Sequence, residues 1–396
     1  MLFQVIDKKN NCPEIFYDGK IIEYKNHNEL TKTWSYVPHL KKTKVECANL
    51  YCSGKTPEEV CPDHLRQEWT EVSKKMKSFL KSFITAKISL DEFCTFNMIP
   101  EKFLLEFFHV KNKITDHVLK TYEKPKNYDF LYDLDRVLTS ISDRRLNIDE
   151  KAFEKLFETY GAHRKLVRLS ESGNRLVYNL FGTKTGRLTT KPNSFPILTL
   201  KSNYKDLVVP NNDWLLELDF NSAELRTLLS LAGHEQPKED IHMWNRENIF
   251  KDDSLSRQEA KTKIFAWLYN STSQMPEAEK IYDREKIKNE YFDGSNVKTL
   301  FDRKIQADNH HSLSYIIQST TSDLLLRQMI KIHDFLKDKK SYVAFCVHDS
   351  IVIDLSKEDR SSLEELISLF RDTDLGEFKV NASVGDNYGN LRKLNV

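Results

Sequence analysis

An apolar run that ends in an acid is the feature that most constrains the fold of this chain. Residues 215–226 read LLELDFNSAELR, a pattern that predicts a buried β-strand ending near Asp219 and turning at once into a helix. A carboxylate at the end of a buried strand must be hydrogen-bonded, protonated or bound to a cation, because desolvation disfavours its charged form. We therefore look for the likeliest partner of Asp219 elsewhere in the chain.

A second acid lies in a similar setting. Residues 342–355 read YVAFCVHDSIVIDL, in which two apolar runs flank His348 and Asp349. The pattern predicts a hairpin of two buried strands with the His-Asp pair at its turn. Two carboxylates brought together make a hard-oxygen site of the kind that Mg²⁺ prefers, together with substrate phosphates. The plainer alternative is that each aspartate only caps or turns its own segment.

The third informative stretch is SRQEAKTKIFAWLYN, residues 256–270. Ser256 and Glu259 match a capping box, which predicts that a helix begins directly after Ser256. Two cations and then two aromatic residues recur along this helix every four positions and share one face: Arg257, Lys261, Phe265 and Tyr269. The order suits a nucleoside triphosphate, with its phosphates near the positive helix end and its sugar and base near the rings. An ordinary amphipathic helix with buried rings is the alternative.

Composition places the chain among globular proteins of two or three parts. It has 396 residues, of which 39% are hydrophobic and 30% charged, and no apolar stretch approaches the roughly 18 residues of a membrane span. The start of the sequence turns charged within a few residues, so we expect no secretory signal. The 6 cysteines are too sparse for a disulfide framework, which favours a reducing compartment.

Positive charge is concentrated in one segment although the net charge is only +1. Residues 161–205 hold nine Lys or Arg against the single acid Glu171. Such a segment suits a polyanion, and a solvated face is the equally good alternative. Texture also changes along the chain, from short β-like runs in residues 1–60 through helical patterns in 62–120 to interleaved apolar strands and helices after about 206, which predicts an α+β fold.

The motifs together resemble one known family. TGRLTT (185–190), DFNSAELR (219–226), DIH (240–242), RQEAKTKIFAWLY (257–269), IIQSTTSD (316–323) and VHDS (347–350) follow the order of the DNA polymerase I family, family A. The resemblance covers about residues 130–396 and implies a right-hand fold of palm, fingers and thumb. It implies a polymerase domain over 131–396, with palm and a reduced thumb at about 131–240, fingers at about 241–305 and palm at about 306–396, preceded by a mixed α/β region over 1–130.

The resemblance also implies an activity, the template-directed addition of dNTPs to the 3′ end of a primer on primer-template DNA. Asp219 and Asp349 match the two metal-binding palm aspartates, which would hold two Mg²⁺ ions, with Mn²⁺ as a substitute. Arg257 and Lys261 match the residues that hold the triphosphate, and Lys261 is also placed to protonate the leaving pyrophosphate.

Further nucleotide contacts follow from the same resemblance. Phe265 matches the position that packs on the incoming sugar, and Tyr269 the aromatic residue near the templating base. Glu224 matches the steric gate that leaves no room for a 2′-hydroxyl, and His242 the histidine on the phosphate side.

Four residues are expected to contact DNA on the same grounds. Thr185 and Arg187 lie in TGRLTT, Gln318 lies in IIQSTTSD, and His348 is expected at the primer terminus. Because the minor groove presents similar acceptors for every correct pair, an Arg and a Gln there would test pair shape without choosing sequence.

The chain departs from the family pattern mainly by missing length. Only about 35 residues separate Asp149, in a stretch that resembles the palm entry, from TGRLTT, where the family usually places a long helical thumb. We therefore expect low processivity unless a partner protein compensates. Ser350 also replaces the acid that commonly follows the second aspartate.

The region before residue 131 carries two further expectations. A proofreading exonuclease needs several carboxylates, and the opening FQVIDKKN offers only Asp7 before a run of lysines, so the region is a possible exonuclease remnant without 3′–5′ activity. A Zn²⁺ site is a weaker hypothesis, because the spacing of its candidate ligands is irregular. Those candidates are Cys47, Cys52, Cys61 and His64.

Two other functions remain open at this point. A single-subunit RNA polymerase would share the two aspartates and the Arg-Lys helix, although Glu224 and Phe265 argue against it. A catalytically silent DNA-binding replication accessory would keep the fold without needing the acids and cations of the motifs. The expected location is the cytoplasm of a bacterium or of a phage-infected host cell, with an organellar matrix as the alternative.

Overall fold

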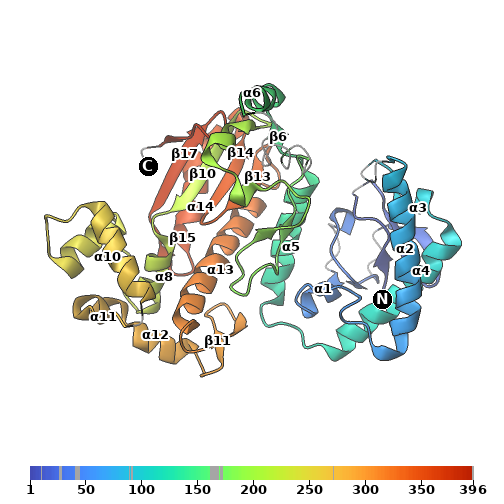
Figure 1. Ribbon diagram of the computed structural model, residues 1–396, viewed down its shortest axis with the longest axis horizontal. Helices are drawn as coiled ribbons and strands as arrows, with labels where there is room; N and C mark the ends of the chain where they lie inside the picture. Colours follow the sequence, from blue (N-terminus) through green and yellow to red (C-terminus); the bar gives the residue numbers. More distant parts are fainter. Residues whose placement is uncertain are drawn as a thin grey trace. The chain divides into compact units, whose positions relative to one another are not determined.

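The computed structural model describes residues 1–396 except residues 10, 26–28, 41–44, 89, 91, 161–168, 170–172, 271 and 395–396. The described chain divides into two compact units, Met1–Asp143 and Arg144–Val396 (Figure 1). Three of the basic residues predicted to meet a polyanion, Arg164, Lys165 and Arg168, lie outside the described residues.

The first unit packs helices against a small sheet. Its strands β1, β2 and β3 form an antiparallel sheet, and β4 pairs with β5. Helix α4 covers this sheet and also packs on α2, with the rings of Phe16 and Phe108 stacked 6.5 Å apart between sheet and helix. The elements of this unit are β1 (Gln4–Val5), β2 (Glu14–Tyr17), β3 (Lys20–Glu23), β4 (Lys32–Thr33), β5 (Glu46–Cys47), α1 (Ala48–Tyr51), α2 (Arg66–Thr85), α3 (Thr95–Met98), α4 (Glu101–Thr121) and α5 (Tyr128–Asp143).

The first compact unit extends to Asp143, beyond residue 130, where the sequence analysis ended the N-terminal region. Helix α5 belongs to the first unit because its aromatic residues pack there. The Tyr128 hydroxyl accepts a hydrogen bond from the Cys47 backbone N–H at 2.7 Å, and the Tyr132 ring meets Tyr36 edge to face at 5.9 Å. These contacts span about 80 to 100 positions of sequence, so no local pattern could have placed the boundary.

The second unit is built on a five-stranded antiparallel sheet in the order β13-β14-β10-β17-β18. Helices α13 and α14 lie against this sheet (Figure 1). Its first elements are β6 (Asn147–Ile148), α6 (Glu150–Tyr160), β7 (Tyr178–Asn179), β8 (Thr189–Thr190), β9 (Val208–Val209), β10 (Trp214–Phe220), α8 (Ala223–Leu231), α9 (Ile241–Asn245), α10 (Arg257–Tyr269), α11 (Pro276–Tyr282) and α12 (Arg284–Tyr291). The later ones are β11 (Asn296–Lys298), β12 (Lys304–Gln306), α13 (Ser312–Phe335), β13 (Tyr342–Val347), β14 (Ser350–Leu355), α14 (Leu363–Arg371), β15 (Asp372–Thr373), β16 (Gly376–Glu377), β17 (Val380–Gly385) and β18 (Arg392–Lys393).

Alternation along β10 separates the core face of the sheet from the opposite face. Leu216, Leu218 and Phe220 are fully or almost fully buried, and the Phe220 ring stacks on Phe370 of α14 with centroids 4.2 Å apart. Because successive side chains of a strand point to opposite faces, Glu217 and Asp219 lie on the other face of the sheet. One face of the predicted apolar strand therefore packs into the core, and the opposite face carries the acidic side chains of the candidate site.

Helices α8 to α13 form a second core around buried side chains such as Leu228, Ile264, Trp267, Tyr282 and Ile316. The buried side chains of Ile264 and Trp267 anchor one face of helix α10 in this core. The opposite face of the helix is not covered by this core. The predicted start of α10 is confirmed: Ser256 caps the helix, and the reciprocal bond from Glu259 completes the capping box.

Candidate nucleotidyl-transfer site

Two aspartates come together at one end of the central sheet. Asp219 lies next to last in β10 and pairs across the ladder with Ser350, the first residue of β14. Asp349 immediately precedes Ser350 in the two-residue turn between β13 and β14. The predicted hairpin is therefore present, and its turn brings Asp349 beside Asp219. Both aspartates line one cavity of about 270 Å³.

The electrostatics of Asp219 reflect this placement. Burial is the main reason that its pKa rises from 3.8 to about 6, and the nearby charges of Glu217 and Asp349 act in the same direction. The Asn381 amide, which donates to Asp219 at 3.2 Å, and the charge of Lys261 partly oppose the shift. The site thus holds one carboxylate whose charge the protein alone does not fully stabilise.

The backbone beside each aspartate adopts a conformation that is unusual for residues with a side chain. His348, at the hairpin turn, has a φ of 52°, and Ser222, at the start of α8, has a φ of 54°. Left-handed backbone costs on the order of 1 kcal/mol outside glycine and clusters at functional sites. At both positions the strained residue sets the direction in which the chain leaves an aspartate-bearing segment.

Helix α10 presents its charged and aromatic face to the same cavity. Arg257, Lys261 and Phe265 line it opposite the two aspartates, together with Glu224 from α8. The Phe265 ring stacks on Tyr269 with a centroid distance of 6.2 Å and an interplanar angle of 8°. The cavity therefore has an acidic side on the sheet and a basic and aromatic side on the helix.

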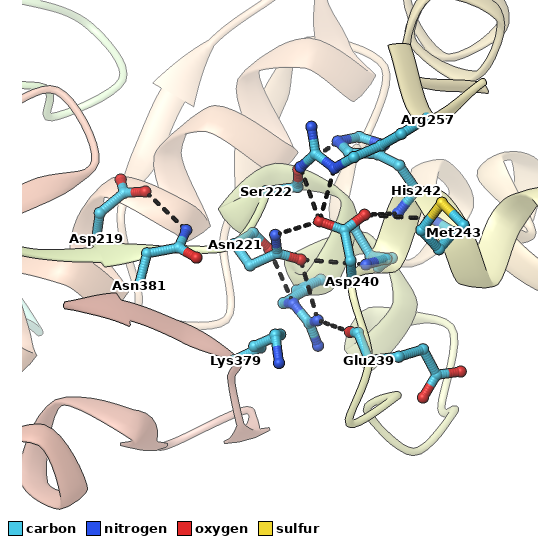
Figure 2. Close-up of polar contacts among 12 residues, drawn as sticks. Asp219, Asn221, Ser222, Glu239, Asp240, His242, Met243, Arg257, Lys379 and Asn381 are labelled. Atoms are coloured by element: carbon cyan, nitrogen blue, oxygen red, sulfur yellow. Dashed lines mark hydrogen bonds and ion pairs between the residues drawn. The ribbon is translucent and has the colours of Figure 1, made fainter. Parts of the chain in front are cut away.

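Arg257 is held by an acid in this conformation. Its Nε and Nη2 donate to Asp240 Oδ2 at 3.0 and 2.7 Å, and Asn221 donates to the same oxygen at 2.8 Å (Figure 2). The other oxygen of Asp240 accepts from the backbone N–H groups of His242 and Met243 at 3.0 and 3.2 Å. Burial alone would raise the pKa of Asp240, but the bonds from Arg257 and Asn221 outweigh it and hold the pKa at about 2.

A buried arginine fixes the turn that follows Asp219. Arg226 is 0% exposed, and its Nε donates to the Asn221 carbonyl at 2.8 Å. Its Nη1 and Nη2 donate to the carbonyls of Pro237 and Glu239 at 2.9 and 2.8 Å. Although burial lowers its pKa to about 10, Arg226 stays charged at neutral pH and ties the turn to the loop that carries Asp240. Both Arg226 and Asp240 lie within motifs named in the sequence analysis. Nothing in the local sequence pattern indicated the contacts that they make.

His242 is not among the residues that line this cavity. It is 0% exposed, and its Nε2 lies 2.6 Å from Ser222 Oγ (Figure 2). Burial lowers its pKa to about 4, so the ring is neutral at pH 7. A direct contact between His242 and a phosphate is therefore not available in this conformation, because the ring is fully buried.

Glu224 is engaged from two sides. Its carboxylate accepts from Arg187 on one oxygen and from the Tyr269 hydroxyl on the other. Burial raises the pKa of Tyr269, and the Glu224 charge adds to the shift, while Arg187 and the Gln318 amide oppose it. Four predicted site residues from four segments thus meet around the Tyr269 hydroxyl.

The loop that carries Arg187 is fixed by close packing. Thr185 is buried, and Gly186 has a φ of 81°. A Cβ on Gly186 would lie 2.5 Å from the guanidinium carbon of Arg303, which itself makes hydrogen bonds of 3.0 and 2.6 Å to the fully buried Asp323. Only glycine fits such an approach.

The remaining candidates lie apart from this cavity. His348 is exposed at the hairpin turn. Asp7, in the first unit, accepts hydrogen bonds from Lys9 at 2.7 Å and from the Thr95 backbone and hydroxyl at 2.8 and 2.6 Å, which gives it a structural role.

The zinc hypothesis gains no support. Cys47, Cys52 and Cys61 are buried thiols, whereas His64 is exposed. Within the described ranges no three or more His, Cys, Asp or Glu residues are grouped as a metal site.

Two findings concern the reducing compartment and the absence of a membrane span that the sequence analysis had led us to expect. Cys12 and Cys94 form a disulfide, which the sparse cysteines had not led us to expect, because the two lie 82 positions apart. No helix of the described ranges has both the length and the apolar character needed to cross a bilayer.

Known proteins with related sequences are DNA polymerases. No model of a known protein family matches the sequence. The thermostable DNA polymerase I of Thermus aquaticus is 26% identical over 239 residues, which are 48% of this chain and 29% of that protein. The corresponding protein of Thermus filiformis is 25% identical over 241 residues, again 48% of this chain and 29% of the relative. The chain thus spans less than a third of the length of these curated relatives.

A solved structure shares the fold. It is the POL domain of Pol1 from M. smegmatis in complex with DNA primer-template and dNTP, with a TM-score of 0.59 and 13% sequence identity, covering 86% of this chain and 81% of that chain. The expected α+β polymerase fold is therefore confirmed. The chain is thus similar in sequence to DNA polymerase I proteins and shares the fold of a polymerase domain.

Proposed function

We propose that this chain is a DNA-directed DNA polymerase that adds dNTPs to the 3′ end of a primer by phosphoryl transfer. One observation carries the proposal: a carboxylate pair and a cation-aromatic helix face each other across a single cavity. Phosphoryl transfer depends on positioning and charge neutralisation rather than on covalent chemistry by the protein, so these few groups suffice.

The carboxylate pair fits divalent metal ions. Asp219 and Asp349 offer only oxygen donors, and Mg²⁺ typically takes one or two carboxylates plus substrate phosphates. A cation beside Asp219 would also favour the charged form that burial and Asp349 oppose. When bound, two such ions would activate the primer 3′-hydroxyl and neutralise charge on the triphosphate. We propose Mg²⁺ at these two residues, with Mn²⁺ as a substitute.

The side chains of α10 would bind the triphosphate. Arg257 lies in the first turn, where the helix dipole favours phosphates, and its guanidinium can exchange Asp240 for a phosphate oxygen. Lys261 is exposed on the same face and can donate a proton to the leaving pyrophosphate. Phe265 and Tyr269 offer stacked rings to the sugar and base.

Sugar and pair selection would come from the Glu224 cluster. The Glu224 carboxylate lines the same cavity as the two aspartates and would exclude a 2′-hydroxyl. Arg187 and Gln318, which meet at the Tyr269 hydroxyl, are donors suited to the minor-groove acceptors that correct pairs share. Thr185 and His348 would contact the nucleic acid at the same end.

Primer extension tests the proposal. The intact chain should extend a labelled primer with dNTPs and Mg²⁺, and Asp349→Asn should reduce the rate at least about 100-fold, on the scale of losing a metal-ion contribution of several kcal/mol. Asp386→Asn, an exposed acid after β17, is the matched control and should extend normally. Extension that survives Asp349→Asn, or that uses NTPs as well as dNTPs, would reject the assignment.

Two accompanying proposals concern what the chain does not do. We propose that it lacks 3′–5′ proofreading, since Asp7 is already bonded to Lys9 and Thr95. We also propose low processivity without a partner protein, since the described part of residues 150–177 contains a single long helix, α6, of 11 residues. Removal of a mismatched 3′ nucleotide, or hundreds of additions per binding event in the presence of a DNA trap, would contradict these proposals.

A further inference from the structure

The first unit contains a cavity that the proposed polymerase function does not use. It has a volume of about 210 Å³ and lies among β1, β4, α2 and α4. Its walls are largely apolar and aromatic, with Trp34, Phe107 and Phe108 among them. Cavities lined by apolar side chains with a few convergent polar groups are the usual form of small-molecule sites.

Two ammonium groups belong to the walls of this apolar space. Lys8 and Lys111 both line the cavity. Lys111 Nζ lies over the face of the Phe108 ring, with the centroid 5.5 Å away. Desolvation disfavours an ammonium such as that of Lys111, and the cost falls when an anion binds beside it.

A hydroxyl in the same wall lacks a partner. Thr33 is 0% exposed and lines the cavity, and its Oγ1 has no hydrogen-bond partner among the described residues. Most buried hydroxyl groups are hydrogen-bonded. An unpaired one therefore either lowers the stability of the fold or binds an atom of a ligand. This observation is independent of the two lysines and concerns the same space.

We propose that this cavity binds a small organic anion, with its carboxylate or phosphate group at Lys111 and the Thr33 hydroxyl and its apolar body against Trp34, Phe107 and Phe108. The volume limits the ligand to about the size of a substituted benzene ring, since drug-sized ligands occupy pockets of roughly 300 Å³ or more. The proposal is separate from the polymerase site and does not depend on that function.

Titration of the full chain with three probes tests the proposal. Benzoate and phenyl phosphate carry the two candidate head groups, and benzyl alcohol is the neutral reference. We expect at least one anion to bind with a Kd below about 1 mM, and at least about tenfold more tightly than benzyl alcohol, as hydrogen bonds to charged groups provide. Whichever anion binds better identifies the head group.

Two variants locate the binding. Lys111→Met keeps the length of the side chain and removes its charge, and it should weaken the anion at least about tenfold. Lys102→Met, an exposed lysine on the same helix, is the matched control and should bind like the native chain. Leu80→Trp fills the cavity without changing charge and should also prevent binding, which keeps the test valid if Lys111→Met does not fold.

Proton uptake gives a second measurement. Burial, and to a lesser extent the charge of Lys8, lowers the pKa of Lys111 to about 7. An anion beside the ammonium favours its charged form, so binding at pH 8 should take up close to one proton, and binding at pH 6 almost none. Calorimetry in buffers of different ionisation enthalpy measures this number. The proposal fails if neither anion binds at 10 mM, on the order of ten times the expected Kd, if benzyl alcohol binds equally well, or if Lys111→Met leaves the affinity unchanged.

Discussion

Replacing Asp219 with asparagine should stabilise the metal-free protein. The new side-chain amide would keep an oxygen for the Asn381 amide but would carry no charge beside Asp349. The raised pKa means that folding opposes ionisation of the Asp219 carboxyl group. The unfolded chain ionises near pH 3.8 and the folded chain near pH 6. The resulting destabilisation is therefore absent below the lower pKa, grows between the two values and is complete above the higher one.

The size of the effect follows from the shift. A rise from 3.8 to about 6 corresponds to about 3 kcal/mol at pH 7.5, at about 1.4 kcal/mol for each pKa unit. At pH 5 the same two values give about half of that. Urea unfolding in EDTA should therefore show Asp219→Asn to be more stable than the native chain by up to about 3 kcal/mol at pH 7.5, with a smaller gain at pH 5.

Magnesium should remove most of the difference in stability between the two proteins. Saturating Mg²⁺ would stabilise the native chain by RT ln(1 + [Mg²⁺]/Kd), about 2.7 kcal/mol at 100 times the Kd, and would leave Asp219→Asn nearly unchanged. Asp354→Asn is the control, since Asp354 is buried on β14 and accepts from the backbone N–H groups of Asn211 and Asn212 at 2.7 and 2.9 Å. That variant should lose stability. The reasoning is refuted if Asp219→Asn unfolds at the same or a lower urea concentration than the native chain in EDTA at pH 7.5.

Three further predictions concern the residues around the cavity. Asp240→Asn keeps the helix cap but releases Arg257 from a half-exposed ion pair, so the KM for dNTP should fall up to about fivefold in steady-state extension, whereas an unchanged KM would show that Asp240 does not compete with phosphate. Arg226→Met leaves three backbone carbonyls without their donor and should destabilise the chain by about 3 kcal/mol or more in urea unfolding, whereas exposed Arg360→Met should change little. Gly186→Ala should displace the Arg303 guanidinium and weaken primer-template binding in a filter or anisotropy assay without changing the Mg²⁺ affinity.

Local signals in the sequence predicted the local parts of this structure. The capping box placed the start of α10 at Arg257, because its two hydrogen bonds lie within four residues. The two apolar runs around His348 and Asp349 predicted a hairpin, because a two-residue turn leaves antiparallel pairing as the only arrangement. The family resemblance then supplied the expectation that the two aspartates meet.

The parts that the sequence did not predict depend on distant contacts. The His242 ring is buried against Ser222, 20 residues earlier, and Ser222 has a left-handed backbone angle that only the fold reveals. The disulfide joins Cys12 and Cys94 across 82 positions. A single sequence does not record which distant residues meet, so pairs of this kind carry no signal in its local patterns.

The contacts around Arg226 also bear on how the two sides of the cavity can move. The guanidinium holds the carbonyl of Asn221, the Asn221 amide holds Asp240, and Asp240 holds the first residue of α10. A swing of α10 toward or away from the sheet therefore has to break or carry along a chain of bonds that starts two residues after Asp219. The start of α10 and the turn after Asp219 are in this way joined by one continuous set of hydrogen bonds.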